Sequence, residues 1–339
     1  MRYRNYFYFL LVLIIAAASF FGGVYFARHF SVEEIEWVRH ESLQADPGGN
    51  QAVNNSYTML FVGDIMLDRG IRAVVENRSE GNYFSQFEKI ADVLTGADIT
   101  FGNLEGPISD KGQKQGSIYS FRMESAVTEA LYDAGFDILN LANNHAGDYG
   151  REAMEDTLGR LGRAGIAYAG AGKNIEQAIG PTIIERSGVR VGFLGFSDVG
   201  PDWLKADEAL SGVAIADIQT VTEAVRQARD FADILVVSFH FGEEYQTHSN
   251  ARQRELAHAA IDAGAKIIIG HHPHVAQETE EYKGGIVAYS LGNFIFDQAF
   301  SDETKEALML KVYMKGKSVE RVEKIQIKFN EYYQPELKQ

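Results

Sequence analysis

Three histidines occupy four consecutive positions of this chain, His271, His272 and His274. Imidazole is neutral near pH 7 and has a lone pair to donate, so it is the commonest protein ligand of transition metals. Pro273 stiffens the turn between two of these residues, and His272 and His274 can then point at two neighbouring ions. A polar surface turn is the alternative. Matching ligand types elsewhere in the chain favour a metal site.

The residues before this cluster predict the element that positions it. Residues 267–269 are three isoleucines and predict a buried strand, and Gly270 is expected to let the backbone turn sharply at its end. Further apolar runs predict strands at 58–62, 98–101, 136–141, 189–196, 234–239 and 286–290. Helical spacing occurs at 84–94, 126–134, 152–164, 218–231 and 256–263. Two alternating segments, 307–314 and 319–329, predict a closing antiparallel pair.

Strands that alternate with helices indicate an α/β fold with much parallel pairing. Ligands of such folds gather beyond the carboxyl ends of the strands. The remaining candidate side chains stand at those ends: Asp64, Asn103, Glu105, Asn144, His145 and His240. The other four histidines do not lie at strand ends and are expected to be solvated or at the edge of the core: His29, His40, His248 and His258.

Several of these candidates also have a structural interpretation. Asp64 can cap the following helix, Asn144 can be a left-handed turn residue, and Glu105 can be a solvated acid. His240 follows an apolar run and can be a hydrogen-bonded core histidine. The sequence leaves these alternatives open.

Composition narrows the class of protein. The 339 residues include no cysteine, which excludes disulfides, thiolate catalysis and cysteine-based zinc sites. The formal net charge is −15, and residues 1–30 hold three arginines and no acid, which leaves −18 for the rest. A field of that sign argues against nucleic acid or anionic lipid binding over a broad surface. An anionic substrate would need a local positive focus, which bound metal can provide.

The first 30 residues have the character of a membrane anchor. The 23 residues from 5 to 27 are uncharged, and about 20 apolar residues span a bilayer as a helix. A cleavable signal peptide, cut near Ala16-Ala17-Ala18, is the alternative. Arg2 and Arg4 precede the span, which favours a single-pass protein of the cell membrane with its bulk outside the cytoplasm. Residues 31–56 are predicted to be a linker and 57–339 the folded domain.

Six short motifs follow one another within residues 58–296: Gly63-Asp64-Ile65-Met66-Leu67, Asn103-Leu104-Glu105, Asn143-Asn144-His145 with Asp148, His240-Phe241-Gly242-Glu243-Glu244-Tyr245, Gly270-His271-His272-Pro273-His274 with Gln277, and Tyr289-Ser290-Leu291-Gly292-Asn293-Phe294. Together they resemble the CapA/PgsA family of capsule poly-γ-glutamate biosynthesis proteins, within the calcineurin-like metallophosphoesterase superfamily. The resemblance implies a four-layer sandwich of two mixed sheets flanked by helices. It also implies membrane association and a role in making or exporting a polyglutamate-type envelope polymer.

The resemblance further implies a centre of one or two divalent ions, Mn, Zn, Fe or Mg. The ligands it indicates are Asp64, Asn103, Glu105, Asn144, His240, His272 and His274. His145 would be the general acid or contact phosphate, and Asp148 either orients it or caps the next helix. Candidate substrate contacts are Glu244, Tyr245, His271 and Asn293. Of these, Glu244 and Tyr245 either line the cleft or only support the strand end.

Two positions depart from the superfamily pattern. Met66 stands where a histidine is usual, and a thioether is a poor ligand for hard or borderline ions. Asn103 stands where an aspartate is usual, and Glu105 is the substitute carboxylate if the strand continues. Both changes fit the CapA branch better than a typical phosphatase.

Three functions compete. The first is a membrane-anchored, outward-facing metal-dependent hydrolase or transferase acting on polyglutamate or a similar anionic or phosphate-containing substrate. The second is a non-catalytic subunit of an envelope polymer synthesis or export complex, with a synthase as its partner. The third is a general envelope metallophosphatase. The motifs favour the first function, and the other two are its alternatives.

Overall fold

The computed structural model of the protein describes residues 55–338. The predicted anchor at 1–30 and almost all of the predicted linker lie outside the described residues. Within residues 55–338, no helix has the length and apolar character needed to cross a bilayer. The single-pass anchor therefore stays a prediction.

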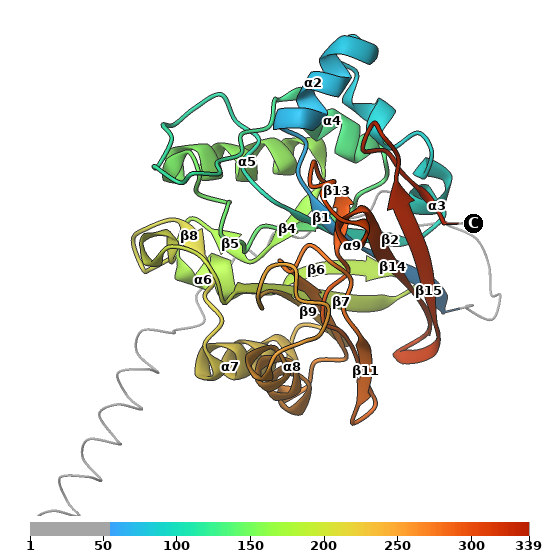
Figure 1. The fold of residues 1–339 in the computed structure, drawn as a ribbon. Helices are drawn as coiled ribbons and strands as arrows, with labels where there is room; N and C mark the ends of the chain where they lie inside the picture. Colours follow the sequence, from blue (N-terminus) through green and yellow to red (C-terminus); the bar gives the residue numbers. More distant parts are fainter. Residues whose placement is uncertain (1–54, 339) are drawn as a thin grey trace, which may run out of the picture. The chain divides into compact units, whose positions relative to one another are not determined.

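Two large sheets form the centre of the described domain (Figure 1). The first runs in the order β16-β15-β14-β1-β2-β3-β4, with β13 also beside β1. Its strands are β1 (Ser56–Ile65), β2 (Ile99–Leu104), β3 (Ile138–Asn140), β4 (Ala167–Ala169), β13 (Asn293–Ile295), β14 (Glu306–Lys315), β15 (Ser318–Phe329) and β16 (Pro335–Leu337).

The second sheet runs in the order β11-β12-β10-β9-β7-β6. Its strands are β6 (Thr182–Arg186), β7 (Val189–Ser197), β9 (Ile234–His240), β10 (Ile267–His271), β11 (Thr279–Tyr282) and β12 (Gly285–Ala288). A separate short pair joins β5 (Ala171–Gly172) to β8 (Gly212–Val213). Parallel and antiparallel pairs occur in both large sheets, so each is mixed.

Helices cover the outer face of each sheet (Figure 1). The first sheet carries α2 (Arg69–Arg78), α3 (Ala91–Thr95), α4 (Ala126–Asp133), α5 (Gly150–Ala164) and the 3-10 turn η1 (Tyr83–Gln86). The second carries α6 (Ile175–Ile179), α7 (Ile218–Ala228) and α8 (Ala251–Ala263). Two short elements complete the fold, η2 (Asp202–Leu204) and α9 (Asp302–Lys305).

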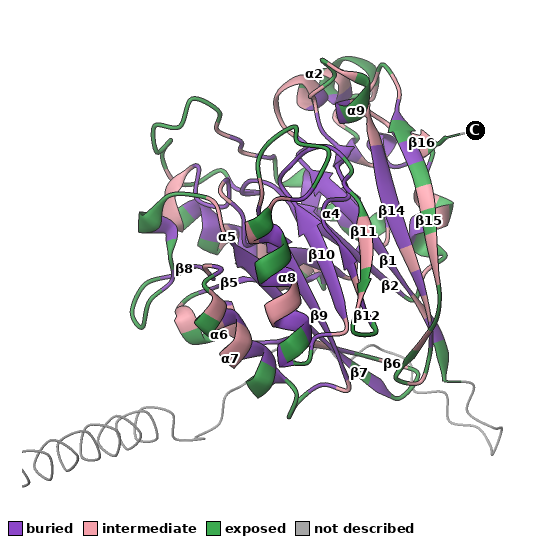
Figure 2. Ribbon diagram, turned by 60° about the horizontal axis from the view of Figure 1, so that its bottom comes forward, coloured by how far each residue is buried: buried purple, intermediate pink, exposed green. Residues whose placement is uncertain are grey.

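Alternation along β1 shows why the layers form. Met59 and Phe61 belong to the apolar cluster between the two sheets, whereas Leu60 and Val62 belong to the cluster under the helices. Successive side chains of a strand point to opposite faces, so a strand covered on both faces is apolar throughout. Strands β9 and β10 are accordingly buried along their whole length, and β1 is buried from Met59 onward (Figure 2). The described domain is thus an α/β fold of four layers, helices, sheet, sheet and helices.

Most predicted elements occur, with changes in their bounds; the strand predicted over 136–141, for example, is the three-residue β3. The closing antiparallel pair is confirmed as β14 and β15. The helix predicted over 84–94 is wrong: η1 and α3 replace it, because the Asn82 side chain accepts from Phe84 N and starts a tight turn. Helix α8 begins five residues earlier than predicted, at Ala251, because Asn250 and Gln253 form a capping box. Helix α7 ends at Ala228 instead of 231.

The predicted role of Gly270 is also wrong. It lies inside β10, and a Cβ there would stand 2.0 Å from Tyr289 O, so glycine permits close packing and not a turn. The backbone leaves its extended path at the histidines instead, with φ of 97° at His272 and 58° at His274. These left-handed conformations let both side chains approach the Glu244 carboxylate.

Candidate metal centre

The carboxyl ends of parallel strands bring the predicted residues together. Asp64 lies opposite Asn103 across β1 and β2, and His271 lies opposite His240 across β10 and β9. The pairing register of β1 shifts at Asp64, a bulge of the kind that re-aims side chains beside functional sites. Both sheets therefore deliver polar side chains to one edge.

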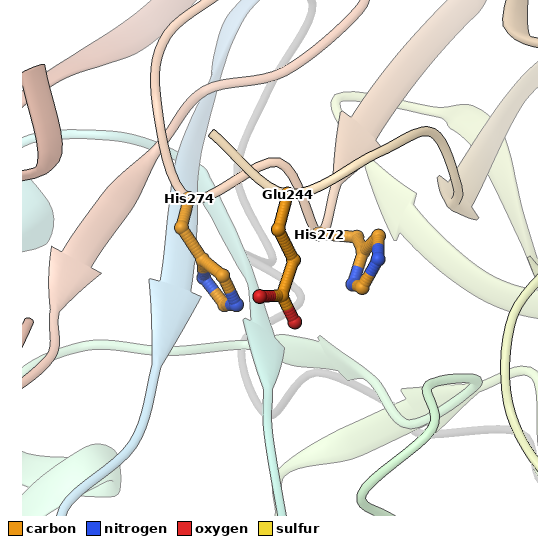
Figure 3. Close-up of side chains that lie close together, drawn as sticks. All are labelled: Glu244, His272 and His274. Atoms are coloured by element: carbon orange, nitrogen blue, oxygen red, sulfur yellow. The ribbon is translucent and has the colours of Figure 1, made fainter. Parts of the chain in front are cut away.

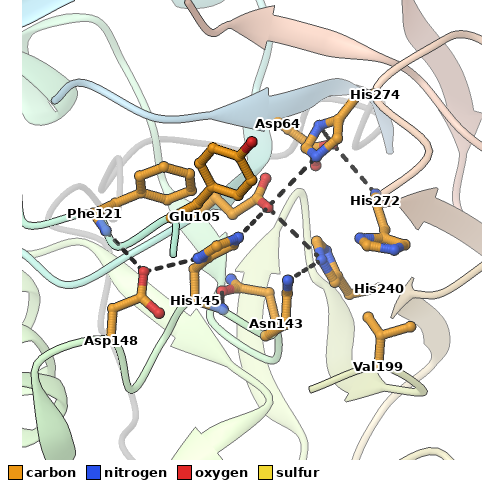
Figure 4. Close-up of polar contacts among 12 residues, drawn as sticks. Asp64, Glu105, Phe121, Asn143, His145, Asp148, Val199, His240, His272 and His274 are labelled. Carbon is orange, nitrogen blue, oxygen red and sulfur yellow. Dashed lines mark hydrogen bonds and ion pairs between the residues drawn. The ribbon is translucent and has the colours of Figure 1, made fainter. Parts of the chain in front are cut away.

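Glu105, directly after β2, lies at the middle of the cluster (Figure 4). Its side chain is fully buried, and neither carboxylate oxygen has a hydrogen-bond partner. Oε1 lies 3.8 Å from His145 Nε2, 3.9 Å from His240 Nε2 and 3.9 Å from His274 Nε2. These separations exceed hydrogen-bond length. Burial raises the pKa of Glu105 well above its ordinary value.

Asp64 is equally buried but has partners. Asn103 Nδ2 donates to Oδ1 at 2.8 Å, and the Nδ1 atoms of His271 and His274 lie 3.2 and 3.3 Å from its two oxygens. Burial alone would raise the pKa of Asp64, but the neighbouring imidazoles of His271 and His274 outweigh burial and hold the pKa well below its usual value. Asp64 is therefore an anion that His271 and His274 orient. It does not cap the following helix, because α2 has no side-chain cap.

The histidines differ in charge preference. Burial, with neighbouring imidazoles, lowers the pKa of His240 well below its ordinary value and lowers the pKa of His272 to about 3. Burial would also lower the pKa of His274, but the carboxylates of Glu105 and Asp64 outweigh it and raise the pKa to about 9. His240 Nε2 lies 2.8 Å from Asn144 Oδ1. Two neutral imidazoles and an amide oxygen thus face the carboxylates.

His145 belongs to a hydrogen-bonded group on the other side of Glu105. Its Nδ1 lies 2.8 Å from Asp148 Oδ2, which also accepts from Phe121 N at 2.8 Å (Figure 4). Helix α5 starts at Gly150 with no side-chain cap, so of the two alternatives for Asp148 the geometry favours orientation of His145. Phe121 covers the imidazole at a ring separation of 4.1 Å. No motif marked Phe121, because a long irregular segment carries it to the site.

Asn103 and Met66 have other partners. The Asn103 amide oxygen accepts hydrogen bonds from Asn140 and Asn143 while its nitrogen donates to Asp64. Met66 is fully buried, and its Sδ accepts from Asp68 N at 3.2 Å. A ligand role for Asn103 stays a prediction. Its present contacts instead hold Asp64 and the β3 end in place.

The four predicted substrate contacts divide into two pairs. His271 and Asn293 are buried, and the Asn293 amide oxygen lies 3.0 Å from His274 Nδ1. His271 lies beside Asp64 and Asn293 lies beside His274, so these two residues orient the Asp64 and His274 side chains. Glu244 and Tyr245 are exposed beyond β9, on the open side of His274. Contact with substrate stays a prediction for all four residues.

The donor set fits a divalent metal. Ligand atoms of Asp64, Glu105 and His274 lie within 4.8 Å of one another, as do those of Glu244, His272 and His274. Ligands bound at about 2.0–2.2 Å from one ion stand roughly 3–4 Å apart, which is the spacing around the unpartnered Glu105 oxygen. Oxygen and imidazole donors suit Zn, Mn or Fe. Asp64, Glu105, Asn144, His240, His272 and His274 are the residues that could hold it.

Comparison with known proteins gives one family. Residues 58–298 match the family described as bacterial capsule synthesis protein PGA_cap. The chain is 37% identical over 274 residues to the PGA biosynthesis protein CapA of Bacillus subtilis (strain 168), covering 80% of this chain and 71% of that protein. It is 37% identical over 270 residues to the capsule biosynthesis protein CapA of Bacillus anthracis, covering 77% of this chain and 65% of that protein, less than two thirds of its length. A solved structure, the calcineurin-like phosphoesterase YfkN from Bacillus subtilis, is similar at a TM-score of 0.44 and 15% identity, over 80% of this chain and 90% of that chain.

Proposed function

Because the chain belongs to the family of bacterial capsule synthesis proteins, we propose that it works in the synthesis or export of poly-γ-glutamate or a similar anionic envelope polymer. We propose further that it does so as a metal-dependent hydrolase or transferase, anchored in the cell membrane by residues 1–30 with its folded domain outside. Its partner would be the synthase or export complex of that polymer.

One observation carries the enzymatic part of the proposal. A fully buried carboxylate, Glu105, has no hydrogen-bond partner and stands 3.8–3.9 Å from three imidazole nitrogens. An unpaired buried charge is costly unless a counterion compensates it. A divalent cation among these groups would be that counterion.

The residues of the centre would have different roles, according to where they lie. A bound divalent ion supplies Lewis-acid polarisation of a substrate oxygen. Asp64 and the imidazoles of His240 and His272 would hold that ion against the strand ends. His145 Nδ1 faces Asp148, so Nε2 faces the cluster. With Nδ1–H donated to Asp148, the imidazolium form would give its second proton, on Nε2, to a leaving group and would be left as the neutral imidazole. Phe121 packs on the same ring and limits the access of water to it.

The experiment uses the full chain purified in detergent. Hydrolysis of phosphodiesters and of γ-glutamyl peptides is measured with and without added Mn²⁺ or Zn²⁺, for the wild type and for Asp64→Asn. We expect one substrate class to be cleaved only with metal and only by the wild type. Turnover that is unaffected by chelation, or no bound metal together with no activity, would overturn the enzymatic proposal. Preference for simple phosphate monoesters would instead indicate a general phosphatase.

A second function has its own support. Met66 Sδ accepts a backbone hydrogen bond, and both polar atoms of the Asn103 side chain are engaged, so two positions of the superfamily's metal pattern offer no free donor. A non-catalytic subunit, which binds metal or the polymer without cleaving it, would tolerate these losses. Polymer production in cells that carry His145→Ala separates the two functions. Normal polymer levels would favour the non-catalytic subunit, and loss of polymer would favour the enzyme.

A further inference from the structure

A second group of metal-ligand side chains lies on the open side of the centre. Glu244, in the loop after β9, approaches His272 and His274 so closely that ligand atoms of all three lie within 4.8 Å of one another (Figure 3). We propose that Glu244 is a ligand of the divalent ion and supplies the donor that Met66 does not. This inference rests on the metal site of the proposed function and adds a specific ligand to it.

Met66 cannot fill the position that a histidine usually occupies. Its side chain is fully buried and packs with Phe121 and Phe296, and its sulfur accepts from Asp68 N. The same Phe296 ring lies 4.8 Å from the His274 ring. Phe296 therefore covers part of the His274 ring, and a replacement donor has to approach His274 elsewhere. The Glu244 carboxylate does so, with ligand atoms of the two residues within 4.8 Å of each other.

The backbone is held in unusual conformations where the three side chains meet. Among non-glycine residues at positive φ are Tyr245 at 64°, His272 at 97° and His274 at 58°. Such conformations are unfavourable for non-glycine residues and persist only where the surrounding structure demands them. Tyr245 N also donates to Pro273 O at 2.8 Å, which ties the Glu244 loop to the histidine turn. Two segments far apart in sequence are thus fixed side by side at this point.

The imidazoles of His272 and His274 have ring nitrogens available to bind an ion next to Glu244. His274 Nδ1 lies 3.0 Å from Asn293 Oδ1, a contact that leaves Nε2 facing the carboxylates. A second partner that fixes the tautomer is characteristic of metal-bound histidine. His272 Nδ1 is buried without a hydrogen-bond partner, on a side chain only 7% exposed. Glu244 is exposed, so it can meet an ion as it enters from solvent.

Adjacent glutamates provide a matched test. Glu243 and Glu244 are both exposed, but only Glu244 belongs to the ligand group. The full chain in detergent is stripped of metal and titrated calorimetrically with Zn²⁺ and, separately, Mn²⁺, as wild type, E244Q and E243Q. Both variants remove one negative charge from the same loop. We expect E244Q to weaken binding by at least about tenfold, and E243Q by less than about twofold because an exposed charge acts through a screened field.

The outcomes separate this inference from the proposed function. Tight binding by the wild type with unchanged affinity in E244Q would overturn the ligand role of Glu244 and leave the metal site standing. Equal losses in both variants would overturn it too, because the effect would then be one of general charge. If the wild type binds neither ion, the metal site itself fails and the Glu244 ligand with it. Metal-free thermal unfolding of E244Q should match the wild type, since an exposed side chain is removed.

Discussion

The two sides of the centre differ in how their polar atoms are satisfied. On the side of β3 and α5, His145, Asp148 and the Phe121 amide are joined by hydrogen bonds of 2.8 Å. On the side of β2 and β10, the Glu105 oxygens, both ring nitrogens of His271 and His272 Nδ1 are buried without a hydrogen-bond partner. Both sides lie at the carboxyl ends of parallel strands, so topology alone does not explain the difference.

The comparison indicates which part of the site is complete without a ligand. A buried polar group left unpaired costs about 1–3 kcal/mol, and more if it is charged. The His145 side avoids that cost with protein groups alone. The Glu105 side avoids it only when a cation arrives. The first side is therefore expected to serve proton transfer and the second to serve metal binding, and variants should separate the two.

Removal of the His145 imidazole should have the largest effect on turnover. We expect His145→Ala to lower the rate on the wild type's substrate by about 10²–10⁴-fold, the usual contribution of a general acid or base. Metal affinity should fall far less than turnover, because His145 Nε2 faces Glu105 from the hydrogen-bonded side. Steady-state kinetics and calorimetry on the same preparation check both statements. A parallel loss of metal affinity would show that the two sides do not act separately.

Neutralisation of Glu105 should weaken the metal-bound protein but should not destabilise the metal-free protein. We expect Glu105→Gln to weaken metal binding by at least about 100-fold, since a ligand matters at least as much as its supporting groups. Without metal the variant should be as stable as the wild type or more stable, because it removes a buried carboxyl group that has no hydrogen-bond partner and is hard to ionise. Thermal unfolding in chelator measures the second effect. A lower melting temperature for the metal-free variant would contradict the idea that a cation completes this side.

Much of the centre could be predicted from strand-end positions. Parallel strands place their carboxyl ends at one edge, so Asp64, Glu105 and His240 were expected to converge, and they do. Asp64 and His274, both predicted as ligands, come within 3.3 Å of each other between Oδ2 and Nδ1. Alternation of apolar and polar residues was enough to place the closing strands β14 and β15.

What could not be predicted depends on tertiary packing. Gly270 was expected to turn, yet the close approach of Tyr289 O keeps it extended, and the turn passes to His272 and His274. Phe121 reaches His145 through a segment without periodicity, so no local pattern marks it. The hydrogen bonds of Asn103 require Asn140 and Asn143 at known positions in space. Each of these features is decided by neighbours distant in sequence.

Removal of metal should destabilise the fold through the Glu105 side. An ion present at 100 times its dissociation constant stabilises the native state by about 2.7 kcal/mol, and a domain of this size loses roughly 2–4 °C in Tm per kcal/mol. We therefore expect a chelator to lower the Tm by about 5–10 °C in the wild type and in His145→Ala alike. Glu105→Gln should show almost no shift. A chelator effect that depends on His145 would place the ion on the wrong side.

Asp156 provides a control for the pH dependence of stability because its carboxylate has hydrogen-bond partners, whereas that of Glu105 has none. Burial would raise its pKa, but hydrogen bonds from Arg160, Ser109 and Lys111 outweigh burial and lower the pKa to about 2. Its stabilisation is therefore complete above the ordinary value near 4 and is lost as the pH falls through about 2.

The contribution of Glu105 to stability changes with pH in the opposite direction. Its raised pKa means that the metal-free fold loses stability as the pH rises above the ordinary carboxylate value. We expect Asp156→Asn to cost about 1 kcal/mol at pH 7, after allowance for partial solvent screening, and to make unfolding less sensitive to acid. Glu105→Gln should not change the loss of stability in acid, and it should reduce the loss of stability at higher pH. Urea unfolding in chelator from pH 2 to 8 measures both limbs, and identical curves for the two variants would mean that their surroundings do not set their protonation.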